Sequence, residues 1–209
     1  MKRIIWILLI LLAAGCSKTE KTSGKSTEAV TSGEITAKAS PASYYSLCDS
    51  LKASLENSDY KNALEIINSL KDELWEKVPL SLQNIKYVKG PDNTYGVYEP
   101  AEDDIFADGE TIYLYAEPVG YKIIKNEDGF YEFGFKADFQ LVSENGEVLG
   151  SQENFATLNF KSWHPNKEVA ITFNFNFSGI SAGRYQIITT VHDENSDKKT
   201  FSKTWFRIK

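Results

Sequence analysis

The stretch that decides the fold is "YEFGFKADFQL", residues 131–141, in which apolar and polar side chains alternate. The polar positions Glu132, Lys136, Asp138 and Gln140 lie between the apolar ones. The apolar positions are Tyr131, Phe133, Phe135, Ala137, Phe139 and Leu141. Because successive side chains of a β-strand point to opposite faces of the sheet, this pattern predicts a strand with one buried face and one solvated face.

The same alternation recurs along residues 80–209. It is found in "TIYLYAE" (111–117), "VAITFNFNF" (169–177) and "YQIITTV" (185–191). Turn-forming residues separate these runs, as in "EDG" (127–129), "ENG" (144–146), "SAG" (181–183) and "ENSD" (194–197). About eight short strands with one apolar face each predict two antiparallel sheets packed against each other.

Two segments of this region resemble the start and the end of an immunoglobulin-like sandwich, as found in many exported bacterial proteins. They are "IFADGETIYLYAE" and "ISAGRYQIITTVHD", with Gly109-Glu110 entering an early strand and Gly183, Tyr185 and Asp193 near the end. The resemblance implies an immunoglobulin-like antiparallel β-sandwich over residues 80–209. It also implies a tyrosine-corner role for Tyr185, whose hydroxyl would bond to backbone at the rim. The Cys…Trp…Cys core of antibody domains is absent.

The first sixteen residues, "MKRIIWILLILLAAGC", combine a basic start, a short apolar run and small residues before Cys16. The apolar run is shorter than the roughly 20 residues of a membrane-spanning helix, and it matches the apolar part of a secretory signal peptide. The segment resembles the lipobox of bacterial lipoproteins, although Ala13 stands where leucine is commoner. The resemblance implies a signal peptide over residues 1–15 and lipidation of Cys16 by acyl chains such as palmitate. The expected location is the bacterial cell envelope, and the outer membrane if the host has two membranes.

Residues 16–41 form the expected lipidated cysteine and a disordered tether. The segment is rich in Ser, Thr, Lys, Glu and Gly, and it has almost no apolar side chains to bury. Its expected role is to hold a folded part of the chain away from the membrane.

Residues 42–79 predict a helical hairpin, which makes the fold mainly β with a small α part. The first helix places Tyr44, Leu47, Cys48, Leu51 and Leu55 on one stripe. The second helix begins after Ser58 or Asp59, ends at Pro79, and carries the apolar stripe Tyr60, Ala63, Leu64, Ile67, Leu70, Leu74 and Val78. The hairpin is expected to pack with these stripes on the β region, which leaves Cys48 a small buried residue.

Charge and composition exclude several classes of protein. The formal net charge of −6 disfavours nucleic acid as a partner and electrostatic docking on anionic lipid, so membrane attachment should be covalent or hydrophobic. Two cysteines and two widely spaced histidines, His164 and His192, do not match a zinc site. The loop "DENSDKK" (193–199) lacks the glycine and glutamate of a calcium loop and predicts a hairpin turn instead. No metal or other cofactor is expected.

Aromatic residues are the candidate binding residues. Tyr113 and Tyr115 alternate with the apolar residues Ile112, Leu114 and Ala116, which are expected to be buried. Phe201 and Trp205 alternate with Phe206 and Ile208, and the sequence leaves open which of these two pairs is buried. All four are therefore candidates for an outer face. Exposed rings there would stack on sugars or anchor a protein partner. The preferred alternative is that the helical hairpin covers them.

The sequence therefore predicts a lipid-anchored envelope protein that acts as a non-catalytic interaction module for a protein or a glycan. No catalytic residue is assigned, because no nucleophile elbow or zinc-protease motif is present. Two alternatives stay open. One is a hydrolase or enzyme accessory with a site in the acidic loop at residues 99–110, and the other is a structural spacer in an envelope assembly.

Overall fold

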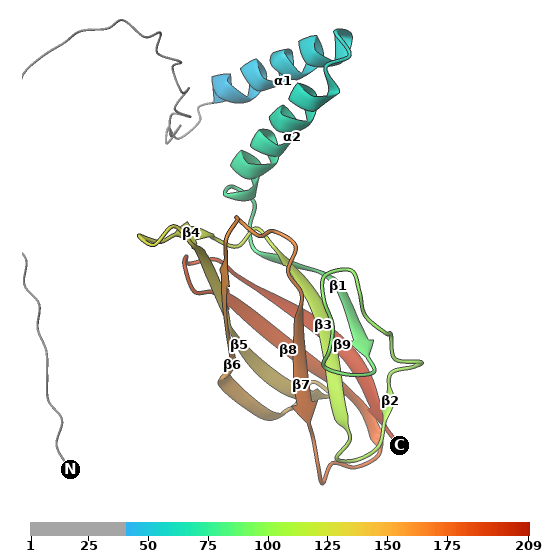
Figure 1. The fold of residues 1–209 in the computed structure, drawn as a ribbon. Helices are drawn as coiled ribbons and strands as arrows, with labels where there is room; N and C mark the ends of the chain where they lie inside the picture. The colour runs from blue at the N-terminus through green and yellow to red at the C-terminus, as the bar shows by residue number, and fades with distance from the viewer. Residues whose placement is uncertain (1–40) are drawn as a thin grey trace, which may run out of the picture. The chain divides into compact units, whose positions relative to one another are not determined.

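A computed structural model describes residues 41–209. The fold is mainly β, with two helices that precede the strands (Figure 1). The signal segment, Cys16 and the predicted tether lie outside the described residues, apart from Pro41. The elements in chain order are α1 (Pro41–Glu56), α2 (Tyr60–Trp75), β1 (Ser81–Val88), β2 (Ile105–Phe106), β3 (Thr111–Val119), β4 (Ile124–Lys125), β5 (Tyr131–Ser143), β6 (Val148–Ser162), β7 (Ile171–Asn176), β8 (Gly183–Asp193) and β9 (Lys199–Ile208).

The strands form two sheets. The smaller sheet has the order β1-β3-β7, and the larger one has the order β2-β9-β8-β5-β4, with β6 also paired to β5. Every pairing of these strands is antiparallel except that of the two-residue β2 with β9. The predicted antiparallel pairing is thus confirmed. β6 was not among the strands named from the sequence, because only its second half, from Ala156 to Lys161, alternates apolar and polar side chains.

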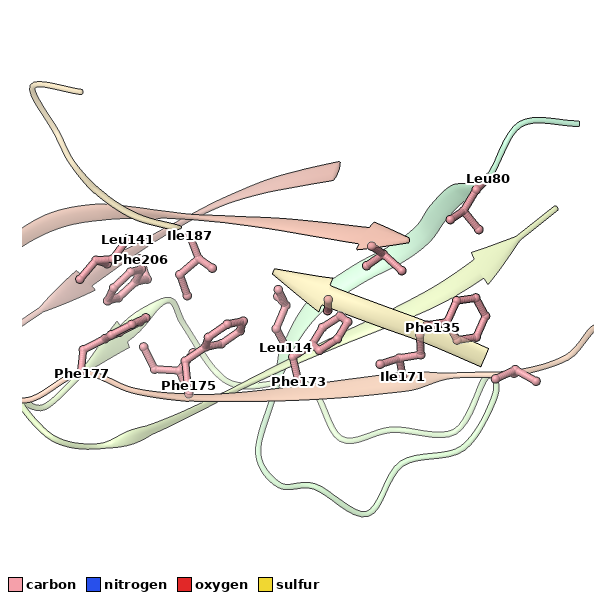
Figure 2. Close-up of a cluster of buried hydrophobic side chains, with 14 of the residues drawn as sticks. Leu80, Leu114, Phe135, Leu141, Ile171, Phe173, Phe175, Phe177, Ile187 and Phe206 are labelled. Atoms are coloured by element: carbon pink, nitrogen blue, oxygen red, sulfur yellow. The ribbon is translucent and has the colours of Figure 1, made fainter. Parts of the chain in front are cut away.

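The core lies between the two sheets, and side chains from both of them meet in it (Figure 2). Phe139 of β5 lies 5.5 Å from Phe175 of β7, measured between ring centroids. Phe177, which follows β7, stacks on Phe206 of β9 at 5.7 Å. The apolar face predicted for residues 131–141 is confirmed, since Phe133, Phe135, Ala137 and Leu141 are buried.

Two local predictions at the ends of β8 are confirmed. The Tyr185 hydroxyl donates a 2.7 Å hydrogen bond to the Ser181 carbonyl, which is the backbone contact expected of it. Residues 194–198 form the turn between β8 and β9. The sequence had not predicted that Asp193 is buried and accepts a hydrogen bond from the Lys122 backbone N–H, which ties this turn to the segment after β3.

The helical hairpin packs internally through one side of α2. The Asp59 side chain caps α2 by accepting a hydrogen bond from the Asn62 backbone N–H, as predicted. The Asn62 side chain donates to the Ser54 hydroxyl of α1 at 2.7 Å, so this side of α2 faces α1. Ala63 and Ile66 are buried on the same side.

The prediction that the apolar stripes of the hairpin pack on the β region is wrong. Tyr60, Leu64, Ile67, Leu74 and Val78 are exposed, and so is Cys48. The physical reason is that α2 carries two apolar sides. The side with Ala63 and Ile66 packs on α1, which leaves the other side in solvent.

Trp75, the last residue of α2, joins the hairpin to the β region. Its indole Nε1–H donates a 2.8 Å hydrogen bond to the Tyr121 carbonyl, and its ring packs edge-on against the Tyr121 ring. Lys198 reinforces the junction, because its ammonium donates to the carbonyls of Glu76 and Gly120. The hairpin is therefore attached through the C-terminal end of α2.

Candidate functional site

The strongest candidate for a functional surface is the outward side of β9. Its alternate residues Ser202, Phe206 and Ile208 are buried in the core. Because side chains alternate across a strand, the remaining positions share the outer face of the sheet. These positions, called here the β9 row, are Lys199, Phe201, Lys203, Trp205 and Arg207. Cationic and aromatic residues alternate strictly along this row.

The two rings of the β9 row are flanked by cations at cation–π distance. Phe201 is 63% exposed, and the Lys203 ammonium lies 5.8 Å from its ring centroid. Trp205 is half-buried, and the Arg184 guanidinium of β8 lies 4.4 Å from its ring centroid. The rings therefore present apolar surface beside positive charge.

The register of β8 against β9 extends this surface sideways. Each residue of the β9 row pairs with an outward residue of β8. The pairs are His192↔Lys199, Thr190↔Phe201, Ile188↔Lys203, Gln186↔Trp205 and Arg184↔Arg207. None of these outward β8 residues carries a negative charge. The surface is thus positive and partly apolar, in a chain whose net charge is −6.

The cations of the β9 row are free of carboxylate partners within residues 41–209. Neighbouring cations on the same sheet are paired, as Lys136 is with Glu194 and Arg184 with Glu144. Lys199, Lys203 and Arg207 make no ion pair with any described residue. Three cations with no local partner are available to an anionic ligand.

His192 is held beside this surface by Asp138 of β5. Its Nε2 lies 2.7 Å from Asp138 Oδ2, and Asp138 also accepts a 2.8 Å hydrogen bond from the Asn154 backbone N–H. Burial raises the pKa of Asp138, but the hydrogen bonds from Asn154 and His192 outweigh this effect and lower its pKa below the usual 3.8. Asp138 therefore stays ionised at neutral pH and orients the imidazole. The sequence did not predict this partner of His192.

Tyr115 occupies a different place from the one predicted. It lies on the three-stranded sheet and is fully buried. Its hydroxyl donates to Glu117 at 2.6 Å and accepts from the Gly96 backbone N–H at 3.0 Å, and the Tyr98 ring lies 4.4 Å away. Burial and the Glu117 carboxylate raise the pKa of Tyr115 to about 12. The prediction of an exposed ring at Tyr115 is therefore wrong.

The four predicted aromatic residues do not form one site. Tyr113 and Tyr115 belong to β3 in the smaller sheet, whereas Phe201 and Trp205 belong to β9 in the larger one. The preferred alternative, a cover by the helical hairpin, is also wrong. Residues 94–98 cover Tyr115, and Phe201 is open to solvent. Only Phe201 and Trp205 lie together on an open face, with Tyr113 half-buried on the other sheet.

Two carboxylates of the acidic loop, Glu99 and Glu102, share the Lys89 ammonium, and Asp103 and Asp108 bond elsewhere. Glu102 lies 3.7 Å from the Lys89 ammonium. Asp103 accepts a hydrogen bond from the Ile105 backbone N–H, and Asp108 accepts from those of Gly179 and Ile180. Each of these carboxylates is thus engaged by Lys89 or by a backbone N–H. In residues 41–209, no cluster of His, Cys, Asp and Glu has the geometry of a metal site.

A cavity lies beside His164, but it carries no catalytic pair. It has a volume of 680 Å³ and lies between α2 and residues 162–168. Asp72 and Lys167, which line it, pair with each other. The Ser162 hydroxyl donates to the His164 carbonyl, and no described side chain hydrogen-bonds to the His164 ring. General-base chemistry needs an oriented imidazole, and this one has no orienting partner.

Comparisons with known proteins assign neither a family nor a function to this chain. No protein-family model matches the chain. No curated protein matches it either. Solved structures with partial similarity include the sporulation control protein Spo0M from Bacillus subtilis, which is 11% identical with a TM-score of 0.34 over 63% of this chain and 50% of that chain.

Two further structures show a similar level of resemblance. A DUF3823 family protein from Bacteroides ovatus is 10% identical with a TM-score of 0.31, over 62% of this chain and 53% of that chain. A superoxide reductase (neelaredoxin) from Ignicoccus hospitalis is 10% identical with a TM-score of 0.29, over 66% of this chain and 89% of that chain. The chain spans about half the length of the first two structures. Similarities this distant carry no argument about function.

Neither α1 nor α2 has the length and apolar character required to cross a bilayer, and no other helix occurs in residues 41–209.

Proposed function

We propose that this chain is a lipid-anchored protein of the bacterial cell envelope that binds an anionic glycan without catalysis. The anchor would be Cys16, and the binding surface would be the β9 row. The observation that carries the binding proposal is the strict alternation of cations and rings on the outward side of β9. The β region would be an immunoglobulin-like sandwich, a fold supported by the two facing antiparallel sheets and the Tyr185–Ser181 hydrogen bond.

An acidic glycan fits the β9 row better than a neutral one. The faces of sugar rings are apolar and stack on aromatic side chains, while their carboxylates or phosphates pair with cations. Lys199, Lys203 and Arg207 supply three charges at alternate positions, and Phe201 and Trp205 supply the intervening rings. A protein anchored in the envelope by lipid would meet such glycans at close range.

We expect the full chain, purified in detergent, to bind a soluble polyuronate and not an uncharged glucan of similar length. The double substitution Phe201→Ala/Trp205→Ala should weaken polyuronate binding more than about tenfold, because ring contacts in binding sites commonly contribute more than 1 kcal/mol each. Isothermal titration calorimetry measures both effects. The affinity should fall steeply with added salt, as charge pairing requires.

Trp163→Ala is the matched control, since Trp163 is an exposed ring 72% accessible to solvent outside the β9 row. Equal polyuronate affinity in the double variant and the wild type would refute the β9 row as the site. Capture of an envelope protein by the wild type, lost in the double variant and without polyuronate binding, would replace the glycan with a protein partner.

The anchor has a separate test. We expect a bacterial host to incorporate labelled palmitate into the wild type and into Cys48→Ala, but not into Cys16→Ala. The chain has only these two cysteines, so the two variants form a complete pair. Because Cys48→Ala leaves the proposed lipidation residue intact, the membrane fraction should also retain this variant. Equal labelling of both variants would overturn the lipidation proposal.

A further inference from the structure

The exposed side of α2 carries a regular apolar stripe, called here the α2 stripe. Its members are Tyr60, Leu64, Ile67, Leu74 and Val78. Together with Lys71, these residues follow one another at intervals of four, three, four, three and four, which is the spacing of the a and d positions of a coiled coil. The backbone N–H of Val78 donates to the Leu74 carbonyl, so the helical geometry continues to the end of the stripe.

The α2 stripe has no partner within residues 41–209. The side of α2 that packs on α1 carries Ala63 and Ile66 instead. Ile67, Leu74 and Val78 line an open apolar groove of 380 Å³ together with Trp75 and Val119. A helix that is apolar on two sides, with one side occupied, is built to contact a second element through the other.

The size of the α2 stripe matches one half of a stable interface. Its five residues are 37–69% exposed. With accessible areas of about 150–250 Å² for large side chains, they leave roughly 500 Å² of apolar surface in solvent. A standard interface buries about 800 Å² per partner, of which about 60% is apolar. One partner is therefore expected to bury roughly 500 Å² of apolar surface.

The charge of α2 favours a second helix over a membrane surface as the partner of the α2 stripe. A helix that lies on a membrane surface is rich in Lys and Arg on its polar face. α2 instead carries Lys61 and Lys71 together with the acidic residues Glu65, Asp72 and Glu73. This balance does not favour anionic lipid, whereas heptad spacing favours another helix with the same repeat.

We propose that two copies of this chain associate through the α2 stripe, with their α2 helices antiparallel. A parallel pair in register would place Lys71 against Lys71 of the other copy, and like charges at a core position destabilise a coiled coil. In an antiparallel pair centred near residue 69, Leu64 of each copy faces Leu74 of the other, and Lys71 faces Ile67. This inference does not depend on glycan binding or on lipidation.

The test is the mass of the full chain in detergent by sedimentation equilibrium, with micelles in large excess over protein. The wild type should sediment as a dimer, and Leu74→Lys should weaken the dimer at least about tenfold, the effect of removing a central apolar contact. Leu55→Lys is the matched control, because Leu55 of α1 and Leu74 are each 50% exposed and only Leu74 belongs to the stripe. Circular dichroism checks that each variant keeps its helices.

The orientation is tested by a pair of double variants. In Leu64→Lys/Leu74→Glu, an antiparallel dimer places each introduced lysine opposite an introduced glutamate, so this variant should associate. Leu64→Lys/Leu74→Lys should be a monomer. A monomeric wild type, or equal weakening by Leu55→Lys and Leu74→Lys, would overturn the proposal. Monomeric behaviour of both double variants, with a dimeric wild type, would overturn the antiparallel arrangement.

Discussion

Replacing Phe135 with alanine is expected to lower the free energy of unfolding by about 3–5 kcal/mol, the usual cost of deleting a buried ring. Phe135 lies in β5 and is fully buried. Its ring packs edge-on against Tyr121 at 5.1 Å and contacts Phe160 of β6 at 6.1 Å. Two strands and the segment after β3 therefore lose contacts at once, and close-packed neighbours relax only partly into the cavity.

Urea unfolding followed by tryptophan fluorescence measures this loss. Phe201→Ala is the matched control, because it removes the same side chain from an exposed position of β9. Exposed substitutions of this kind usually change stability by less than about 0.5 kcal/mol. Similar midpoints for the two variants would show that Phe135 is not part of a packed core. Because Phe201 also belongs to the β9 row, this variant shows in addition whether glycan binding can be weakened without a loss of stability.

The second large effect is expected at Trp75. Its replacement with alanine should also cost about 3–5 kcal/mol, because the side chain is buried and joins α2 to the β region. Trp75→Phe keeps an aromatic ring but removes the indole N–H. The Tyr121 carbonyl then loses its donor in a buried place, which costs about 1–3 kcal/mol.

Far-ultraviolet circular dichroism and hydrogen exchange distinguish the consequences of the Trp75 variants. Exchange should accelerate most in α2 and in the segment around Tyr121, because these lose their shared contact. Trp163→Phe is the control, since Trp163 is exposed. Unchanged exchange in α2 of Trp75→Ala would show that the hairpin is held by contacts other than this junction.

The candidate surface was predictable in part. Phe201 and Trp205 were predicted as outer residues, but the sequence left open which alternate set of this strand is buried. Ser202, Phe206 and Ile208 settle the question, since their burial in the core forces the β9 row outward. The contribution of Arg184 was not predictable, because it depends on the pairing of β8 with β9.

The error at Tyr115 has a similar origin. Alternation correctly placed Tyr115 opposite Leu114 on β3, yet it does not say what covers that side of the sheet. Residues 94–98 cover it, and their contact with β3 spans about twenty positions in sequence. A loop without periodicity gives no signal of where it will pack.

Local periodicity by itself determined β3, β5, β7 and β8 with their apolar faces, the turns near them and the two helices. These features follow from the geometry of one element, because side-chain direction repeats every two residues in a strand and about every 3.6 in a helix. Tertiary structure alone decided which apolar side of α2 meets α1, which loop buries Tyr115 and which cations gather beside Phe201 and Trp205. Those outcomes depend on contacts between distant segments, where one of several compatible faces is chosen by the packing of the whole chain.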